Sequence, residues 1–162
     1  REVEDVWKLR VVNTSDKDIR LLNIRAEAEG IEGKFEITTL AAGSTVDVLE
    51  ASAQKYPEDP KGIQYETENL AFFSEPLTIC TETVTLYGQD NWIKAENISD
   101  HDISQDVFVY YKNVEDGIFQ GGITYRARFP GGIGAGQSAE QQIVHYKQDK
   151  SRIMYVTVGQ EK

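Results

Sequence analysis

The sequence predicts an all-β protein built from two tandem antiparallel β-sandwiches, and three observations support this fold class. Apolar and polar residues mostly alternate, which is the period of a half-buried strand. Clusters of Gly, Pro, Asn, Asp and Ser separate the short apolar segments at frequent intervals, and no long helical pattern occurs. Two short motifs also recur in the same order, which indicates a duplicated unit.

The duplication rests on two pairs of matching segments. "VVNTSDKDI" (11–19) and "AENISDHDI" (95–103) are identical at five of nine positions, with an offset of 84 residues. "LAAGSTV" (40–46) and "IGAGQSA" (133–139) match at an offset of 93, so we expect nine inserted residues in the second copy, within 113–122. The boundary is expected near 78–83, which gives one repeat over 1–80 and another over 81–162.

Each repeat contains several predicted strands. In the first, "KLRVV" (8–12), "LNIRAEAE" (22–29) and "KFEITT" (34–39) carry the apolar pattern of strands. Residues 55–70 lack alternation and hold two of the four prolines, so we expect a long loop there, with room for a short helix. The second repeat has candidate strands in six segments: "TVTLYG" (83–88), "NWIKAE" (91–96), "DVFVYYK" (106–112), "ITYRARF" (123–129), "QIVHY" (142–146) and "SRIMYVTV" (151–158).

The repeated Asn-x-Ser-Asp stretch is best explained as a turn between two strands. Short Asn and Asp side chains accept hydrogen bonds from backbone amides two residues further on. The same letters also match a glycosylation sequon, and a calcium site at Asp16/Asp18 or Asp100/Asp102 is an alternative. Calcium wants six to eight oxygen ligands, however, and two carboxylates fall short of that, so no metal site is assigned.

Composition excludes several classes of function. The net charge of −10 makes nucleic acid a poor partner, and no apolar run is long enough to span a bilayer. The single cysteine, Cys80, rules out an internal disulfide and a CxxC motif, and we expect it to be a buried structural thiol. The chain begins with Arg1 rather than Met, from which we expect an upstream signal or anchor and an exported protein.

No catalytic or cofactor motif is visible. "FPGGIGAGQS" (129–138) lacks the Lys-Ser/Thr of a phosphate-binding loop and is expected to be an ordinary turn. His101 lies in the polar turn and His145 in a predicted strand, and neither belongs to a recognisable triad or metal motif. We therefore expect no enzyme activity and no cofactor. A glycan hydrolase with an unrecognised pair of carboxylates is the alternative from another class.

One face of the second repeat is a candidate ligand-binding surface. If Val107 and Val109 face the core, Phe108 and Tyr110 lie on the opposite face, and Arg126 and Arg128 lie on the polar face of a nearby strand. Aromatic and arginine side chains dominate binding hot spots. The competing interpretation is that this face is covered within the chain, in which case the two rings are buried.

The second repeat resembles the FxLYD-type immunoglobulin-like domains of bacterial surface and secreted proteins. The resemblance is carried by "AENISDHDI", "VFVYYKN" and "IGAGQSA", covers roughly residues 84–158, and extends more faintly over 6–54. The first repeat departs from it by lacking the "VYYKN" aromatics. The resemblance implies immunoglobulin-like sandwiches that act as non-catalytic binding or spacer modules. Their expected partner is a protein or glycan at the cell surface, and the oligomeric state is left open.

Overall fold

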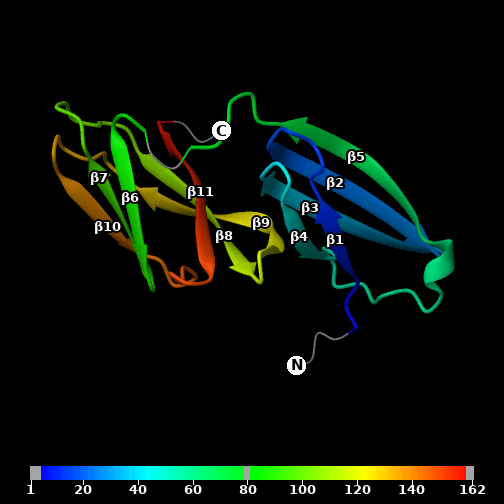
Figure 1. Cartoon of the computed structure of the whole chain (residues 1–162). Helices are drawn as coiled ribbons and strands as arrows, with labels where there is room; N and C mark the ends of the chain where they lie inside the picture. The colour runs from blue at the N-terminus through cyan, green and yellow to red at the C-terminus, as the bar shows by residue number, and fades with distance from the viewer. Residues whose placement is uncertain (1–4, 79–80, 160–162) are drawn as a thin grey trace. The chain divides into compact units, whose positions relative to one another are not determined.

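The computed structural model describes residues 5–78 and 81–159, and this part of the chain is all-β (Figure 1). The predicted fold class is therefore confirmed at the level of an antiparallel, sheet-rich protein. Residues 20–29, whose composition would suit a helix, lie mostly in strand β2 (Ile19–Ala28), as their alternation predicts. Cys80 lies outside the described residues. Among the described residues, no helix has the length and apolar character needed to cross a membrane.

The chain divides into two compact units. Unit 1 consists of Arg1–Pro76 and Glu115–Thr124, and unit 2 of Leu77–Val114 and Tyr125–Lys162. The sequence predicts a single cut at 80/81, whereas this division assigns a short internal segment of the second repeat to unit 1. That segment is the tip of the hairpin formed by β8 (Val107–Glu115) and β9 (Ile118–Phe129).

Unit 1 has two facing layers. One is the antiparallel sheet β3-β2-β5, in which β3 spans Ile31–Leu40 and β5 spans Gln64–Phe72. The other contains β1 (Lys8–Val12), paired antiparallel with β4 (Thr45–Leu49). The core between the layers is formed by buried side chains of both: Trp7, Ile19, Leu22, Ala26, Ala28, Phe35, Ile37, Leu40, Val46 and Val48.

The hairpin tip closes one side of unit 1. Phe119 pairs with Val46 in a parallel register, which adds the start of β9 to β4. Thr124 donates its backbone amide to the Thr38 hydroxyl at 2.9 Å, so the same segment also bonds to β3. A Cβ on Gly122 would overlap the carbonyl oxygen of Glu36, which requires glycine at this approach. The β3–β4 side of unit 1 is thus covered by residues that come late in the sequence.

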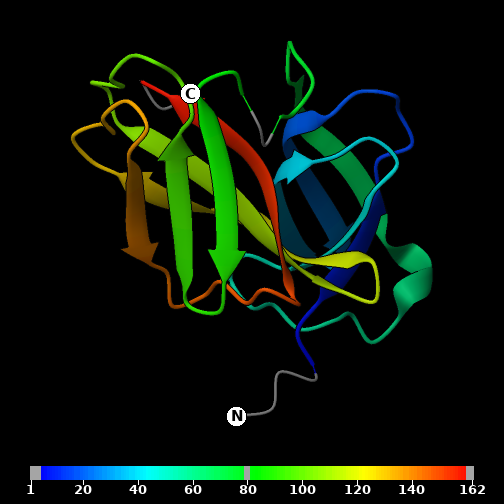
Figure 2. The same cartoon turned by 60° about the vertical axis from the view of Figure 1, so that its left-hand side comes forward.

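Unit 2 also consists of two sheets with a core between them. β10 (Ser138–Gln142), β7 (Trp92–Asn97) and β6 (Val84–Gln89) form one antiparallel sheet, seen side by side in Figure 2. The other sheet contains β9, β8 and β11 (Ser151–Val158). A single core cluster lies between them, formed by Val84, Ile93, Ala95, Ile103, Val107, Val109, Tyr111, Ala127, Phe129, Ile133, Tyr146 and Val156.

The pairing of β1 with β4 matches that of β7 with β10, and the order β3-β2-β5 matches β9-β8-β11. The partners at the open end of each hairpin, farthest from its turn, are Ile19 with Leu40 in unit 1 and Ile103 with Ile133 in unit 2. Twenty-one positions separate the first pair and thirty the second. The nine extra residues therefore lengthen the β8–β9 hairpin, whose tip lies in unit 1.

The repeated Asn turn is present in both units. The Asn13 side-chain nitrogen donates to the Lys17 and Leu40 carbonyls, and its oxygen accepts from the Ser15 amide at 3.1 Å. Asn97 makes the same contacts with His101, Ile133 and Ser99. Both amide groups are buried and bonded to backbone, so they are not accessible glycan acceptors. The turn interpretation of the motif is confirmed.

The predicted long loop over 55–70 is wrong in its second half. The segment contains a short 3₁₀ helix, η1 (Pro60–Gly62), but Gln64 onward forms strand β5. β5 lacks alternation because nearly all of its side chains are exposed, on both faces of the sheet. His145 is also misplaced by the sequence pattern, since β10 ends at Gln142 and His145 lies in the following turn.

Candidate strand-binding edge

The edge of β1 that faces away from β4 carries no strand in the described part of unit 1. Its counterpart in unit 2, β7, is paired on both edges, with β10 on one side and β6 on the other. No strand of unit 1 among the described residues corresponds to β6. Unit 1 therefore has an open strand edge at the position where unit 2 has a paired one.

Burial along the two strands follows this difference. In β7 the inward residues Ile93 and Ala95 are fully buried. At the offset of 84, their counterparts in β1 are Leu9 and Val11, and both remain partly exposed. The outward residues of β1 are exposed, whereas those of β7 are half-buried. Loss of one neighbouring strand accounts for the lower burial at every position.

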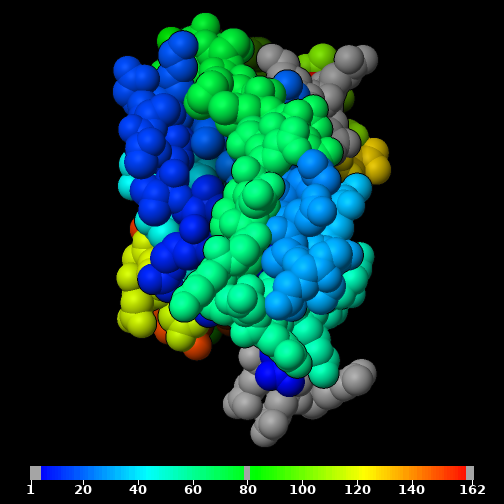
Figure 3. Space-filling view, turned by 90° about the vertical axis from the view of Figure 1, so that its right-hand side faces the viewer, coloured from blue at the N-terminus to red at the C-terminus, as the bar shows by residue number. Residues whose placement is uncertain are grey.

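In the opposite layer, β5 likewise has only one neighbouring strand among the described residues. It pairs with β2 along one edge, and nearly all of its side chains are exposed, including Tyr65 at 52% and Leu70 at 51%. The corresponding strand of unit 2, β11, buries Met154 and Val156. Val156 shares the unit 2 core cluster with Val84, a fully buried residue of β6. Figure 3 faces this side of unit 1, with β5 in green running across the surface beside the dark-blue N-terminal region.

The backbone of β1 is oriented for pairing at its open edge. Trp7 and Asn13 exchange backbone hydrogen bonds with the segments on the β4 side, at Gln54, Glu50, Ser44 and Gly43. Because the hydrogen-bonding direction alternates along a strand, the amides and carbonyls of Lys8, Arg10 and Val12 point to the other side. The corresponding backbone groups of β7 face β6, the strand with which β7 pairs on that side. The open edge can accept main-chain hydrogen bonds from an added strand.

Trp7 fixes the start of β1. Its ring is fully buried and packs edge-on against Phe35, with ring centroids 5.6 Å apart. Next to it, the Glu50 carboxylate accepts the backbone amides of Lys34 at 2.8 Å and Ser52 at 2.6 Å. Burial alone would raise the pKa of Glu50, but its backbone hydrogen bonds outweigh that effect and lower the pKa. The start of β1 is therefore held by a buried ring and by a loop that Glu50 bonds together.

The outer face of β1 is basic. The Arg10 guanidinium makes two hydrogen bonds to Asp47, at 2.8 and 3.0 Å, across the β1–β4 pair. The hydrogen bond from Arg10 is the main reason that the pKa of Asp47 is lowered. Lys8 lies on the same face, two residues away. An incoming strand would place its outward side chains beside these two cations.

The aromatic rings of the surface predicted in unit 2 are not exposed to solvent. Phe108 and Tyr110 are each only 7% exposed, so the condition for this contact surface is not met. The Arg126 guanidinium lies 5.1 Å from the centre of the Phe108 ring. Tyr110 stacks on Tyr155 at 4.2 Å.

Arg128 is exposed and pairs with Asp106 at 2.7 Å. Two hydrogen bonds lower the pKa of Asp106. The larger effect comes from the Gly131 backbone amide and the next from the Arg128 side chain. The two arginines therefore have intramolecular roles, as a cover for Phe108 and as a partner of Asp106.

An exposed aromatic group does occur nearby. Tyr125 is 39% exposed and stacks between Tyr111 and His145, with centroid distances of 5.1 and 5.5 Å. The alternation of "ITYRARF" places Tyr125 on the core face, and His145 is in a turn, so no sequence signal joins the two. Burial, with a smaller contribution from Tyr125, raises the pKa of Tyr111 to about 12. That phenol is neutral at physiological pH and is a poor proton-transfer group.

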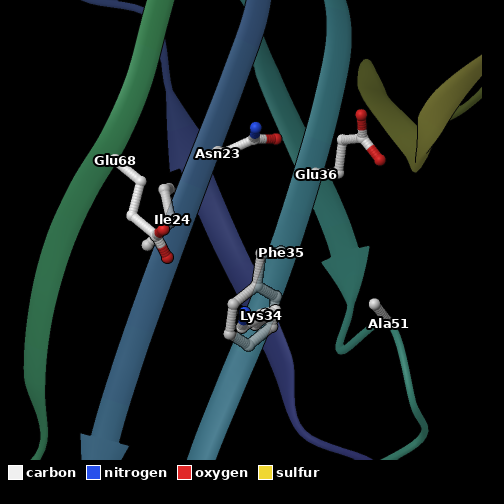
Figure 4. Close-up of a pocket in the computed structure, with 7 residues that line it drawn as sticks. All are labelled: Asn23, Ile24, Lys34, Phe35, Glu36, Ala51 and Glu68. Atoms are coloured by element: carbon white, nitrogen blue, oxygen red, sulfur yellow. The ribbon is translucent and has the colours of Figure 1, made fainter.

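The described part of unit 1 has surface hollows, and one of them contains two carboxylates. One hollow of about 280 Å³ lies over β3, β2 and β5 and includes Glu36, Glu68 and Lys34 (Figure 4). The Glu36 carboxylate is directed away from that of Glu68, so the two do not converge on one point. Within 5–78 and 81–159, no three His, Cys, Asp or Glu side chains are grouped to hold a metal ion.

One buried amine is also out of reach of a substrate. Lys112 is 1% exposed, and burial lowers its pKa to about 8. A lysine with a lowered pKa is chemically suited to nucleophilic catalysis, but this one has no open approach from solvent.

Comparisons with protein-family models, curated proteins and solved structures find no match to this chain. The resemblance to FxLYD-type domains therefore stays a prediction that rests on the quoted residues.

Proposed function

We propose that the chain is a pair of immunoglobulin-like β-sandwiches that acts as a non-catalytic binding module, and that unit 1 binds an extended polypeptide segment along the open edge of β1. One observation carries the proposal. β7 is paired on both edges and buries its inward residues, whereas the matching strand β1 is paired on one edge and leaves them partly exposed.

Strand addition uses two kinds of contact that β1 offers. Main-chain hydrogen bonds supply affinity, and pockets for alternate side chains supply selectivity. The backbone amides of Lys8, Arg10 and Val12, which point toward the open edge, provide the main-chain hydrogen bonds. The half-exposed inward side chains of Leu9 and Val11 provide the second. An added strand would cover apolar surface that is left open beside β1.

The other functions considered have less support. A glycan hydrolase needs two carboxylates that face one substrate, and Glu36 and Glu68 diverge within an open hollow. Glycan or peptide binding through Phe108 and Tyr110 needs open rings, and both rings are buried. A cell-surface setting in a bacterium rests on the FxLYD resemblance, and a precursor with an ordinary N-terminus and no apolar export segment would contradict it.

Selection of peptides against the chain tests the proposal. A displayed library of random twelve-residue peptides would be selected on the wild-type protein, and the enriched peptides would be measured against two variants. Val12→Pro removes an amide at the open edge without removing a β1–β4 hydrogen bond. Val12→Thr keeps the amide and serves as the matched control.

We expect enriched peptides to bind the wild type and V12T alike and to bind V12P at least about tenfold more weakly, by the loss of main-chain pairing. Near-ultraviolet circular dichroism would verify that all three proteins are folded. Equal binding to V12P, or no enrichment over an unrelated protein, would show that the edge is not a binding site.

A further inference from the structure

Building on the proposed function, we infer that the strand added to β1 comes from another polypeptide and has the side-chain pattern of β6. Unit 2 supplies the template, because it shows which strand a completed edge of this kind accepts. The argument has three steps: how β6 reaches β7, why the chain of unit 1 does not turn in the same way, and which side chains the edge selects.

In unit 2 the added strand arrives through a tight hairpin. Gln89 pairs with Trp92, so only Asp90 and Asn91 form the turn. Asn91 has a φ of +71°, a left-handed conformation that Asn tolerates better than most residues. The turn therefore depends on a small polar residue immediately before β7.

In unit 1 the matching residue is Trp7, which is fully buried. Its neighbour Val6 forms a bridge with Lys55, and Asp5 accepts a hydrogen bond from the Tyr56 amide at 2.9 Å. The two described residues before Trp7, Asp5 and Val6, are thus paired with residues 55–56 and not with the open edge of β1. A hairpin like that of β6–β7 would require Val6 and Asp5 to leave these contacts. These contacts argue against a tight hairpin formed by the residues directly before β1, and they favour a strand supplied in trans.

The register of β6 on β7 defines the occupant. Val84 and Leu86 lie opposite Asn97 and Ala95 on the inward face. Transferred by 84 residues, the same strand would lie antiparallel to β1, with its two inward apolar residues opposite Asn13 and Val11. Their neighbours on unit 1 would be the exposed apolar side chains of β5.

The outward face selects an aromatic residue at one position. In unit 2, Tyr87 pairs with Lys94, whose ammonium lies 5.6 Å from the centre of the ring. The counterpart of Lys94 is Arg10, and arginine also binds aromatic faces. A second copy of β1 is a poor occupant, because antiparallel self-pairing centred on the strand would bring Arg10 opposite Arg10. The occupant is an extended segment with alternating apolar residues and an outward aromatic residue.

The probe for this inference is a capped synthetic peptide with the sequence of residues 82–90, "ETVTLYGQD". It would be titrated into the full chain carrying Trp92→Phe, so that Trp7 reports on the start of β1. Hydrogen exchange would follow the backbone amides of Lys8, Arg10 and Val12. A peptide with Leu86→Lys places a charge on the inward face and is the matched control.

We expect saturable binding, at least about tenfold slower exchange at the three β1 amides, and at least about tenfold weaker binding of the L86K peptide. Introducing V12P into the protein should abolish the protection. Equal binding of the L86K peptide, or protection only in β7, would overturn the inference. A concentration-dependent dimer that V12P abolishes would also overturn it, since the occupant would then be a second copy.

The two proposals fail in different ways. If library peptides bind in a V12P-sensitive manner but the β6 peptide does not bind, the open edge is a binding site with another preference, and only the β6 pattern is wrong. If neither binds, the proposed function itself is wrong.

Discussion

Glu50 shows how one side chain can organise a loop. Its carboxylate is 5% exposed and accepts hydrogen bonds from the backbone amides of Lys34, Ser52 and Gln54. These amides belong to the edge of β3 and to the turn after β4. Because Trp7 donates its own amide to Gln54, the carboxylate also fixes the segment that holds the start of β1.

Glu50→Gln is expected to destabilise unit 1 by about 1–3 kcal/mol at pH 7, because the amide group of Gln would oppose a backbone N–H donor. The pKa of Glu50 is lowered in the folded protein, so its stabilisation is present at neutral pH. This stabilisation begins to decline as the pH falls to the ordinary pKa of a glutamate, and it is lost as the pH falls through the lowered pKa of folded Glu50. The difference between wild type and E50Q should therefore shrink in acid.

Urea unfolding followed by Trp7 fluorescence in a W92F background, at pH 7 and near pH 3, measures this effect. Glu58→Gln, at an exposed position of the same loop, is the control and should change little. A difference between E50Q and its parent that is independent of pH would contradict the assignment of a charged, hydrogen-bonded Glu50.

The Asn turn is the residue-level feature that the sequence predicts best. Asn13 and Asn97 each bond to backbone groups two and four residues on, and these local contacts are encoded by the Asn-x-Ser-Asp letters themselves. Each also donates to a carbonyl far along the chain, at Leu40 or Ile133. That second contact depends on the fold, and no local pattern could reveal it.

At the scale of elements, the tip of the β8–β9 hairpin depends on glycine for its position in unit 1. A side chain on Gly122 would overlap the Glu36 carbonyl and approach Val48. Gly122→Val is therefore expected to displace the tip from β3 and β4 and to lower the stability of unit 1 by about 1–3 kcal/mol, the range for overpacking.

The Trp7 unfolding assay in a W92F background measures this loss. Gly62→Ala is the matched control in unit 1, because its Cβ would meet no neighbour within 4 Å. If G122V unfolds at the same urea concentration as its parent, the hairpin tip does not contribute to unit 1.

Strand identity was predictable where one face of a strand is buried. Alternation, or a high content of β-branched and aromatic residues, predicts strands β2, β3, β7 and β8. β5 was missed because an edge strand exposed on both faces has no reason to alternate. Alternation shows which face Phe108 and Tyr110 occupy but not what covers that face, so the sequence alone did not decide between an open surface and a covered one.

The candidate edge was not predictable from the sequence, since it is defined by a missing neighbour. The repeat itself aligns β1 with β7, so a comparison of what precedes each strand was possible. What the letters do not show is that the segment before β1 pairs with residues 55–56, which leaves the edge open.

At the scale of the whole molecule, charge is distributed unevenly. Unit 1 contains nine basic and eighteen acidic residues, a net charge of −9, whereas unit 2 contains eight basic and nine acidic residues, a net charge of −1. The acidity of the chain is therefore a property of unit 1. Long-range attraction would favour partners with basic residues flanking the added strand, and added salt would weaken that attraction.

A shortened chain of residues 1–80 tests the division into units. This fragment matches the repeat predicted from the sequence but lacks 115–124, including Phe119, which is 1% exposed. Loss of a buried phenylalanine alone costs about 3–5 kcal/mol, and the fragment also loses its bonds to Val46 and Thr38.

We expect the fragment to show no cooperative urea transition by Trp7 fluorescence, in contrast to the full chain with W92F. Adding a synthetic peptide of residues 113–126 should restore part of the transition. A fragment that unfolds as cooperatively as the intact protein would show that unit 1 is complete without the hairpin tip.

The lengthened hairpin has an evolutionary consequence. Residues 115–124 belong to unit 1 but are encoded after the first strands of unit 2. A single recombination event therefore cannot move unit 1 without also cutting through unit 2. After the nine-residue extension arose, the two copies would be inherited as one indivisible block, and homologues should carry them together or not at all.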